Sequence, residues 1–370
     1  MSTKVPFVDL RRLQAPLRDQ LQAAFDRVLD HGIYILGPEV ASFERQLAEY
    51  LTAKGSVGVS CGTDALLATF LALRLPAGAE ILMTPLSFVA SASSVLRAGL
   101  RPVFVDLPDV GFHPDVEAFE RAWGPKTAGV LAVHLFGEPF PMAELAALCE
   151  RRGGVLVEDC AQAIGAKAKD GRSVGCAGVA GTLSFFPAKN LGAIGDGGAV
   201  FSDDEQLLER VTQIRQHGRE ARDVYSHLGG NFRLDALQAS FLAVLLPALD
   251  GWVERRRANA HAYLAAFAGL EAQGRLKLPS DMEGHAWNQF CVRTPQRAKL
   301  RAALSAAEVG HAVYYTRALH QQGALASARP VEHLPNAERC CDEVLALPVY
   351  PGLSVAERDR VLEVVTTALA

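Results

Sequence analysis

Residues 155–165 read Val-Leu-Val-Glu-Asp-Cys-Ala-Gln-Ala-Ile-Gly, a short apolar run that ends in two acids and continues into small residues. An apolar run without alternation is typical of a strand buried on both faces of a sheet. Similar runs lie at residues 80–84, 102–106, 128–134, 182–186 and 197–202, and helix-patterned segments lie between several of them, at residues 64–74, 87–98, 114–123 and 142–152. This alternation predicts an α/β fold with a mostly parallel central sheet and helices on both faces. On such a sheet, ligands gather at the carboxyl ends of the strands.

The pattern changes after residue 203. Two helical segments follow, residues 204–216 and 233–270, and Pro247 interrupts the second. Beyond them we expect a smaller α+β domain, with strands at 289–293 and 311–315 and helices at 297–309 and 354–369. We therefore predict a large domain over residues 1–246 and a small C-terminal domain over residues 247–370.

The bulk composition points to small-molecule partners. The chain has 370 residues, 49% hydrophobic and 21% charged, with a net charge of −4, so it offers no general attraction for nucleic acid or an anionic membrane surface. The start of the sequence lacks the apolar segment of a signal peptide, and the longest apolar stretch, residues 241–249, is too short to span a bilayer. The seven cysteines show no CxxC spacing. We expect a cytoplasmic protein without a metal site.

A single lysine follows one of the apolar runs. Lys189 lies in a glycine-punctuated loop between Pro187 and Gly192, directly after the run at 182–186. Partial burial in such a loop lowers the pKa of a lysine and makes its neutral amine available as a nucleophile, as in lysines that form Schiff bases. A solvated surface lysine is the competing interpretation.

The acids that end the run at 155–159 form a second candidate feature. A carboxylate at the end of a buried parallel strand is costly unless a cation pairs with it, and a protonated pyridine nitrogen would be such a cation. Asp159 is our candidate, although it would also serve as the N-cap of a following turn. Gln162 would contact a ligand or complete a capping box.

A third feature suits a phosphate group. Gly62 and Thr63 lie in a small-residue turn between a short apolar run and an apolar-periodic segment. The backbone N–H groups and positive end of such a helix start attract an anion, and the Thr63 hydroxyl adds a donor, although Thr is also an ordinary N-cap residue. Ser184 lies near another strand end and would add one more donor.

Two further residues complete the candidate site. Phe88 follows the run at 80–84 and would stack on a planar ligand, with a core position as the simpler alternative. Asn231 follows two glycines ahead of a helix and would cap that helix or donate to a ligand.

Together these motifs resemble one family. The matching segments are residues 5–10, 35–39, 62–66, 85–88, 134–137, 158–162, 184–192, 195–198, 231–235 and 238–239. In this order and over residues 5 to about 347, they are similar to the DegT/DnrJ/EryC1/StrS aminotransferases, sugar aminotransferases of the type I fold that depend on pyridoxal 5′-phosphate (PLP). A sugar dehydratase of similar sequence has His in place of the Schiff-base lysine, so Lys189 favours transamination.

The resemblance implies roles for the residues named above. Lys189 would bind PLP covalently and move protons at the substrate carbon, Asp159 would pair with the ring nitrogen, and Gln162 would contact the ring oxygen. Gly62, Thr63 and Ser184 would hold the phosphate, and Phe88 would stack on the ring. Members of the family are homodimers, in which the residue matching Asn231 reaches the phosphate of the other subunit.

The resemblance also implies a reaction. L-Glutamate would give its amino group to a keto group of a dTDP- or UDP-linked sugar, with C3 favoured over C4. Two residues in segments that approach the sugar in relatives, Tyr315 and His320, are predicted to bind substrate, although Tyr315 has a structural role as an alternative. A cyclitol aminotransferase, a sugar dehydratase and a non-catalytic binding protein of this fold are the rival interpretations.

Overall fold

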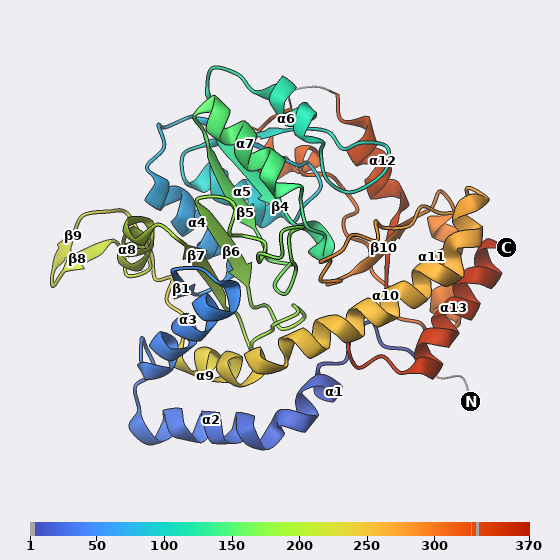
Figure 1. The fold of residues 1–370 in the computed structure, drawn as a ribbon, viewed down its shortest axis with the longest axis horizontal. Coiled ribbons are helices and arrows are strands. Elements are labelled where there is room, and N and C mark those ends of the chain that lie inside the picture. Colours follow the sequence, from blue (N-terminus) through green and yellow to red (C-terminus); the bar gives the residue numbers. More distant parts are fainter. Residues whose placement is uncertain (1–3, 327, 331–332) are drawn as a thin grey trace.

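The computed structural model describes residues 4–326, 328–330 and 333–370. Within them, an eight-stranded sheet has the order β1-β7-β6-β5-β4-β2-β3-β11 (Figure 1). Its strands are β1 (Gly55–Val59), β2 (Glu80–Met83), β3 (Arg101–Phe104), β4 (Thr127–Val133), β5 (Val155–Asp159), β6 (Ala180–Ser184), β7 (Gly198–Ser202) and β11 (Arg329–Pro330). In this described sheet β7 runs antiparallel to both of its neighbours, β1 and β6, and the other strand pairs are parallel. The predicted mostly parallel sheet is confirmed, and each predicted run before residue 203 is a strand, with ends shifted by up to two residues.

The register of the sheet places three strand ends side by side. Val133 of β4 lies opposite Asp159 of β5, and Asp159 lies opposite Thr182 of β6. The residues that follow these strands therefore emerge at the same edge, because the strands are parallel. This edge holds the candidate site.

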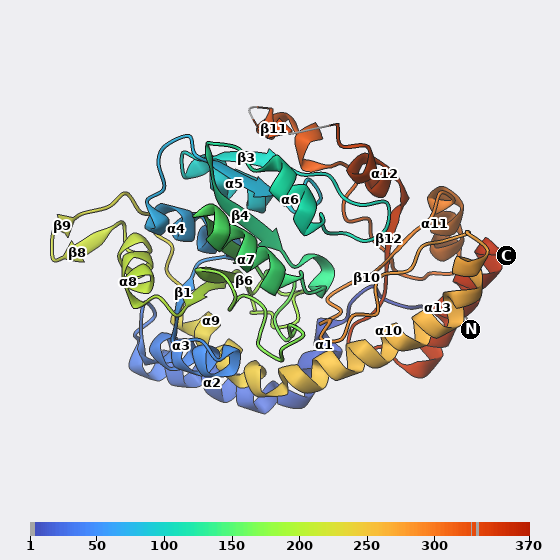
Figure 2. The same cartoon turned by 45° about the horizontal axis from the view of Figure 1, so that its top comes forward.

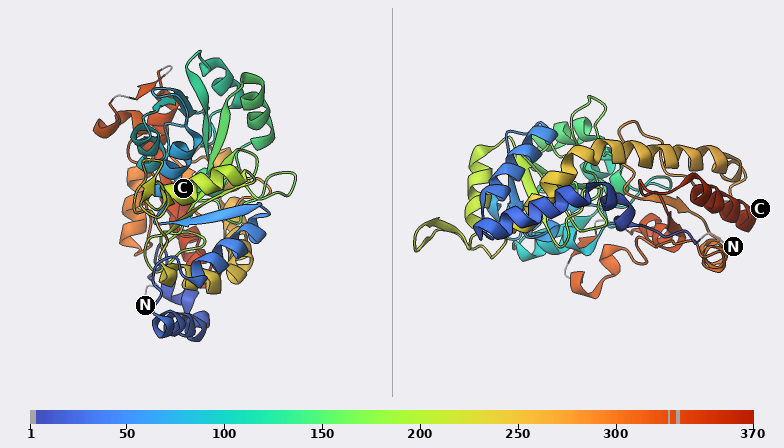
Figure 3. Two further views of the ribbon diagram at one scale, coloured as in Figure 1. Left: turned by 90° about the vertical axis from the view of Figure 1, so that its left-hand side faces the viewer. Right: turned by 90° about the horizontal axis from the view of Figure 1, so that it is seen from below.

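Helices cover both faces of the sheet, as predicted (Figure 2). On one face lie α4 (Gly62–Leu73), α5 (Val89–Arg97) and α8 (Glu205–Ile214), whose apolar side chains pack on alternate residues of the strands. On the other face lie α6 (Val116–Ala122), α7 (Met142–Arg152), α2 (Arg18–His31), α3 (Pro38–Leu51) and α9 (Ala236–Leu245). The short α1 (Leu10–Gln14) precedes α2, and a hairpin of β8 (Arg219–Ala221) and β9 (Val224–Tyr225) projects at the end away from the C-terminus (Figure 3).

The C-terminal part has its own core. The long helix α10 (Leu249–Ala272) follows a short 3-10 turn at Pro247 and packs against α13 (Val355–Leu369). The other elements are α11 (Arg297–Ala306), α12 (Pro335–Glu343) and the antiparallel pair of β10 (Phe290–Arg293) and β12 (Val344–Leu347). Val5 joins the same core and bridges to Val309, so the chain start packs with residues far along the sequence. The two-domain division at Leu246 stays a prediction.

One expected element was wrong. Residues 311–315 form no strand; Ala312 makes a single bridge to Ala346, on the edge of β12 that β10 does not use, and the pairing does not continue to its neighbours. Of the described residues, one helical stretch, Ala236–Ala272, is long and apolar enough to cross a membrane by composition, but 56% of its most apolar 18 residues are buried inside the fold. It is accounted for as a core helix.

Candidate active site

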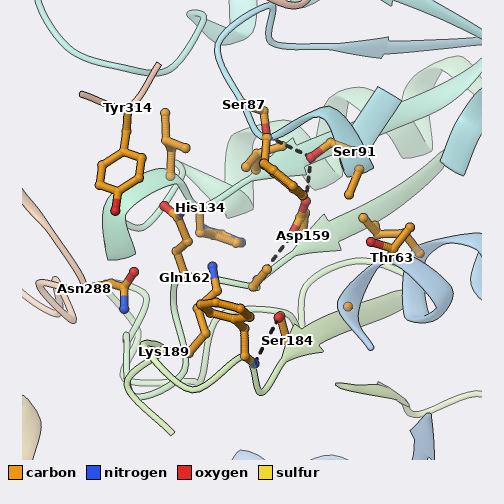
Figure 4. Close-up of a pocket in the computed structure, with 18 of the residues that line it drawn as sticks. Thr63, Ser87, Ser91, His134, Asp159, Gln162, Ser184, Lys189, Asn288 and Tyr314 are labelled. Atoms are coloured by element: carbon orange, nitrogen blue, oxygen red, sulfur yellow. Dashed lines mark hydrogen bonds between the residues drawn. The ribbon is translucent and has the colours of Figure 1, made fainter. Parts of the chain in front are cut away.

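A cavity of about 580 Å³ opens at the strand ends where the sequence predicts a site. Eight of the ten predicted residues line it: Gly62, Thr63, Phe88, Asp159, Gln162, Ser184, Lys189 and Tyr315. They come from the start of α4, the β2–α5 connection, the ends of β5 and β6, the loop after β6 and a segment that precedes α12. Figure 4 shows Lys189, Gln162 and Asp159 among the residues that line the cavity.

Lys189 is partly buried in the loop between β6 and β7. Burial lowers the pKa of its ammonium group to about 8, and the charge of Asp159 opposes part of that shift. A pKa near 8 leaves a useful fraction of the amine neutral at physiological pH. The surface-lysine interpretation therefore does not fit, and the amine can act as a nucleophile or a proton carrier.

Asp159 ends β5 as a buried carboxylate that faces the cavity. The Ser91 hydroxyl donates to its Oδ2 at 2.8 Å, and the Ala161 amide donates to its Oδ1 at 3.1 Å. Because the Ser91 proton is directed at Asp159, the Ser87 hydroxyl, 2.8 Å away, must donate to Ser91. The residues after Asp159 form turns and no helix, and the bond from Ala161 caps the first of these turns, so Asp159 has the capping role left open for it as well as its place in the cavity. Its carboxylate is oriented for a cationic partner in the cavity.

Glu158, the neighbouring acid, points to the other side of the strand. Its carboxylate accepts the amides of Gly175, Ala177 and Gly178 at 2.7 to 2.8 Å and lies 3.0 Å from His134 Nε2. Burial raises the pKa of Glu158, but these hydrogen bonds outweigh burial and leave the pKa lowered. Glu158 thus fixes the loop before β6.

His134 and Glu158, with Cys160, are the one group of described residues whose ligand atoms lie close enough together for a metal ion. The Phe140 amide donates to His134 Nδ1 at 3.0 Å, so the ring proton sits on Nε2 and is directed at Glu158. His134 Nδ1 and the Glu158 oxygens already accept N–H groups, and His134 Nε2 carries a proton. This arrangement does not suit a cation.

The start of α4 offers an anion site. The side chain of its cap residue, Cys61, bonds to the Asp64 carboxylate and caps none of the backbone amides, so the amides of the first turn, including those of Gly62 and Thr63, have no partner within the helix. A Cβ added at Gly62 would lie 2.6 Å from the Ser184 Cβ, and one at Gly198 would lie 2.5 Å from the Cys61 carbonyl carbon. The two glycines therefore allow the helix start to approach Ser184. Free amides, a helix dipole and two hydroxyls converge there, as a phosphate requires.

Phe88, Gln162 and Tyr315 form one wall of the cavity. Gln162 Oε1 accepts the Phe136 amide at 2.7 Å, and its Nε2 donates to the Tyr315 hydroxyl at 3.4 Å, so Gln162 is not part of a capping box. Phe88 is 57% exposed and its ring centroid lies 6.4 Å from that of Tyr315. The alternative that Phe88 is a core residue is wrong. Two aromatic rings thus flank the space above Gln162.

Two predicted residues lie outside this cavity. Asn231 is exposed and bridges to Gln216, away from the lining. His320 pairs with Glu338 at 2.8 Å and packs near Phe104, so it has a structural role outside the cavity.

Several polar lining residues have no role predicted from the sequence, among them Ser87, Ser91, Asn288 and Gln289. The spacing of Ser87 and Ser91, four residues apart at a helix start, was a usable signal because such residues share a face. Nothing near Asn288 in the sequence indicates a site, since the fold brings it there from the C-terminal part.

The fold and the pairing of a buried lysine with a buried carboxylate place the chain in the class of PLP-dependent transferases of type I fold. The crystal structure of NtdA from Bacillus subtilis with bound cofactor PMP superposes with a TM-score of 0.92 at 30% identity and covers 100% of this chain and 86% of that one. The chain belongs to the DegT/DnrJ/EryC1/StrS aminotransferase family, which it matches over residues 16–366, and it is an aminotransferase. The predicted family is confirmed.

Curated relatives align over nearly the full length. The dTDP-3-amino-3,4,6-trideoxy-α-D-glucose transaminase of Streptomyces venezuelae is 39% identical and covers 98% of this chain and 95% of its own. The UDP-N-acetyl-3-dehydro-α-D-glucosamine 3-aminotransferase of Acidithiobacillus ferrooxidans is 36% identical, with 100% and 99% covered. A protein of Geobacillus stearothermophilus named as a pleiotropic regulatory protein is 39% identical, with 97% of both chains covered.

Proposed function

We propose that this chain binds PLP on Lys189 and transfers the amino group of L-glutamate to a keto group of a dTDP- or UDP-linked sugar, with C3 favoured over C4. The observation that carries the proposal is the pairing across one cavity of Lys189, whose pKa is lowered to about 8, with the oriented carboxylate of Asp159. The names of two relatives, both of which describe amino groups at sugar C3, support the choice of substrate and position.

The residues of the cavity fit the cofactor part by part. Asp159 would pair with the ring nitrogen, and Gln162 would donate to the ring oxygen from a side chain that Phe136 already orients. Thr63, Ser184 and the amide of Gly62 would hold the phosphate at the uncapped helix start. Phe88 would lie against the ring. When bound, PLP supplies an electron sink that stabilises the charge left by proton removal beside the amine.

In this proposal, Lys189 carries the protons of the reaction. Its amine takes the α-proton of glutamate in the first half-reaction and returns a proton to the sugar carbon in the second. A pKa near 8 suits both directions, since each protonation state is populated near neutral pH. Both half-reactions use one cavity, so the kinetics should be ping-pong.

We also propose a homodimer with shared sites, working in the cytoplasm. Phe88 and Phe186 line the cavity and are 57% and 53% exposed, and large exposed apolar groups of this kind mark interfaces. Asn231 has no place in the cavity of its own chain, which agrees with a role in the partner's site. Co-expressing Lys189→Ala with Asn231→Ala tests this: mixed dimers should regain activity, because one site then has both residues. No recovery in verified mixed dimers argues against sharing.

The reaction is tested with purified, PLP-loaded protein. It is incubated with L-glutamate and a panel of dTDP- and UDP-linked 3-keto and 4-keto sugars, a keto cyclitol included, and 2-oxoglutarate is measured. We expect 2-oxoglutarate with a 3-keto sugar nucleotide and none with Lys189→Ala. Release only with the cyclitol supports the rival aminotransferase, and loss of water from the sugar without 2-oxoglutarate supports the dehydratase. Protein that never acquires the absorbance of bound PLP supports a non-catalytic role.

A further inference from the structure

Residues 286–289 form a wall of the cavity that comes from the C-terminal part of the chain. The Ala286 amide donates to the Gly137 carbonyl at 2.9 Å, and the Gln289 amide donates to the Phe136 carbonyl at 3.2 Å. On its other side, the buried guanidinium of Arg256 donates to the carbonyls of Trp287 and Asn288 at 3.3 and 3.2 Å. The backbone of this segment is therefore held at fixed positions next to the site.

Backbone carbonyls determine how the side chain of Asn288 is oriented. Asn190, which follows Lys189, has its Nδ2 within 2.9 Å of the Ala286 carbonyl and 3.4 Å of the Ile164 carbonyl. Carbonyl oxygens only accept, so this atom must be the amide nitrogen, and Asn190 Oδ1 faces Asn288. Asn288 must then present its own nitrogen to Asn190, at 2.9 Å.

This chain of constraints leaves one oxygen free. Asn288 is 8% exposed and lines the cavity, and no residue in the described ranges donates to its Oδ1. In Figure 4 this oxygen points away from the Lys189 loop, toward Tyr314. An acceptor with a fixed orientation and no donor within the chain calls for an outside donor.

Gln289 provides a second such acceptor. Its Oε1 is buried and has no hydrogen-bond partner among the described residues, and the side chain lines the same cavity. A buried carbonyl oxygen without a donor destabilises the unliganded protein, so its persistence needs an explanation. Because this oxygen is closed off from the cavity, the Gln289 side chain has to turn for a bound donor group to reach it.

We propose that Asn288 and Gln289 form an acceptor wall that binds hydroxyl groups of the sugar and so helps to select the substrate; this rests on the proposed function. Two carbonyl oxygens accept hydrogen bonds from hydroxyl groups and repel carboxylates. The wall therefore suits the sugar and does not suit glutamate, which brings two carboxylates. Substitutions in the wall weaken sugar binding and leave the glutamate half-reaction unchanged.

The test uses PLP-loaded enzyme and two measurements. Calorimetry compares the binding of dTDP-D-glucose and UDP-D-glucose with that of free dTDP and UDP, and stopped-flow absorbance follows the reaction of the bound cofactor with L-glutamate. Gln289→Met keeps the length of the side chain and removes its acceptor, and Asn288→Ala removes the other. Gln46→Met, on α3 and outside the cavity lining, is the matched control.

We expect each wall variant to bind the sugar nucleotide about three- to tenfold more weakly, which is the range for one neutral hydrogen bond. Gln289→Met should keep the wild-type rate with glutamate. If wild-type enzyme prefers the sugar nucleotide and Gln289→Met retains the whole preference, the acceptor wall is refuted and the proposed function stands. If Gln289→Met slows the glutamate reaction as much as it weakens sugar binding, the residue acts through the Lys189 loop and the wall is again refuted. If wild-type enzyme binds no sugar nucleotide more tightly than the free nucleotide, the sugar gains nothing from the wall and the wall is refuted; the proposed function fails only if no keto sugar nucleotide gives 2-oxoglutarate.

Discussion

Replacing Ser91 by Ala should weaken cofactor retention without unfolding the protein. The substitution removes the 2.8 Å hydrogen bond to Asp159 Oδ2 and leaves the Ala161 bond to Oδ1 in place. A hydrogen bond to a charged group contributes about 1.5 to 3 kcal/mol, which corresponds to about 10- to 150-fold in an equilibrium constant. Because one of the two bonds remains, we expect the lower end, about tenfold weaker binding of PLP.

The assay is fluorescence titration of PLP onto enzyme freed of cofactor, with circular dichroism to show that the fold is kept. Ser93→Ala is the matched control, since Ser93 lies on the same helix and, among the residues that the structure describes, its hydroxyl bonds only to the Ala90 carbonyl, at 3.4 Å. Wild-type affinity in Ser91→Ala would refute the reasoning. An equal loss in Ser93→Ala would show that the effect comes from the helix and not from Asp159.

Three further predictions concern titration and packing. Covalent attachment of PLP to the cofactor-free protein should speed up with pH around a midpoint near 8, since burial lowers the pKa of Lys189 to about 8; a midpoint near 10.5 in stopped-flow traces contradicts this. Burial raises the pKa of Glu138 from 4.5 to about 7. Between these pH values the folded protein therefore holds one more proton than the unfolded chain, which stabilises the folded state. This stabilisation is complete below pH 4.5 and is lost as the pH rises through 7. As the pH rises from 5 to 8, the unfolding free energy of Glu138→Gln, measured with urea, should therefore increase by up to about 3 kcal/mol relative to that of wild type. A difference between the two proteins that does not change with pH argues against this prediction. Gly198→Ala should abolish PLP binding, because the added Cβ would collide with the backbone of Cys61. Gly269→Ala lies in a helix with open space around the added Cβ, so it should stabilise the protein by about 0.5 to 1 kcal/mol. Equal thermal midpoints for the two variants would contradict this.

Local patterns determine much of this protein. The apolar runs predict the sheet, because a strand buried on both faces needs uninterrupted apolar residues. Lys189, Asp159 and Thr63 each lie at or just after the end of such a run. The carboxyl ends of parallel strands meet at one edge of a sheet, so the sequence alone predicts that these residues converge. The family motifs then extend the prediction to Gln162, Ser184 and Phe88.

The tertiary structure decided what depends on residues distant in sequence. Residues 311–315 meet β12 at one bridge and form no strand, and His320 pairs with Glu338 outside the cavity. The orientation of Asn288 depends on Asn190, 98 residues earlier, and on carbonyls that only the folded backbone brings near. Short-range periodicity carries no information about such contacts, because their geometry is set by how the two parts of the chain pack together. The sequence by itself determined which groups perform the chemistry, and the packing decided which other groups orient them.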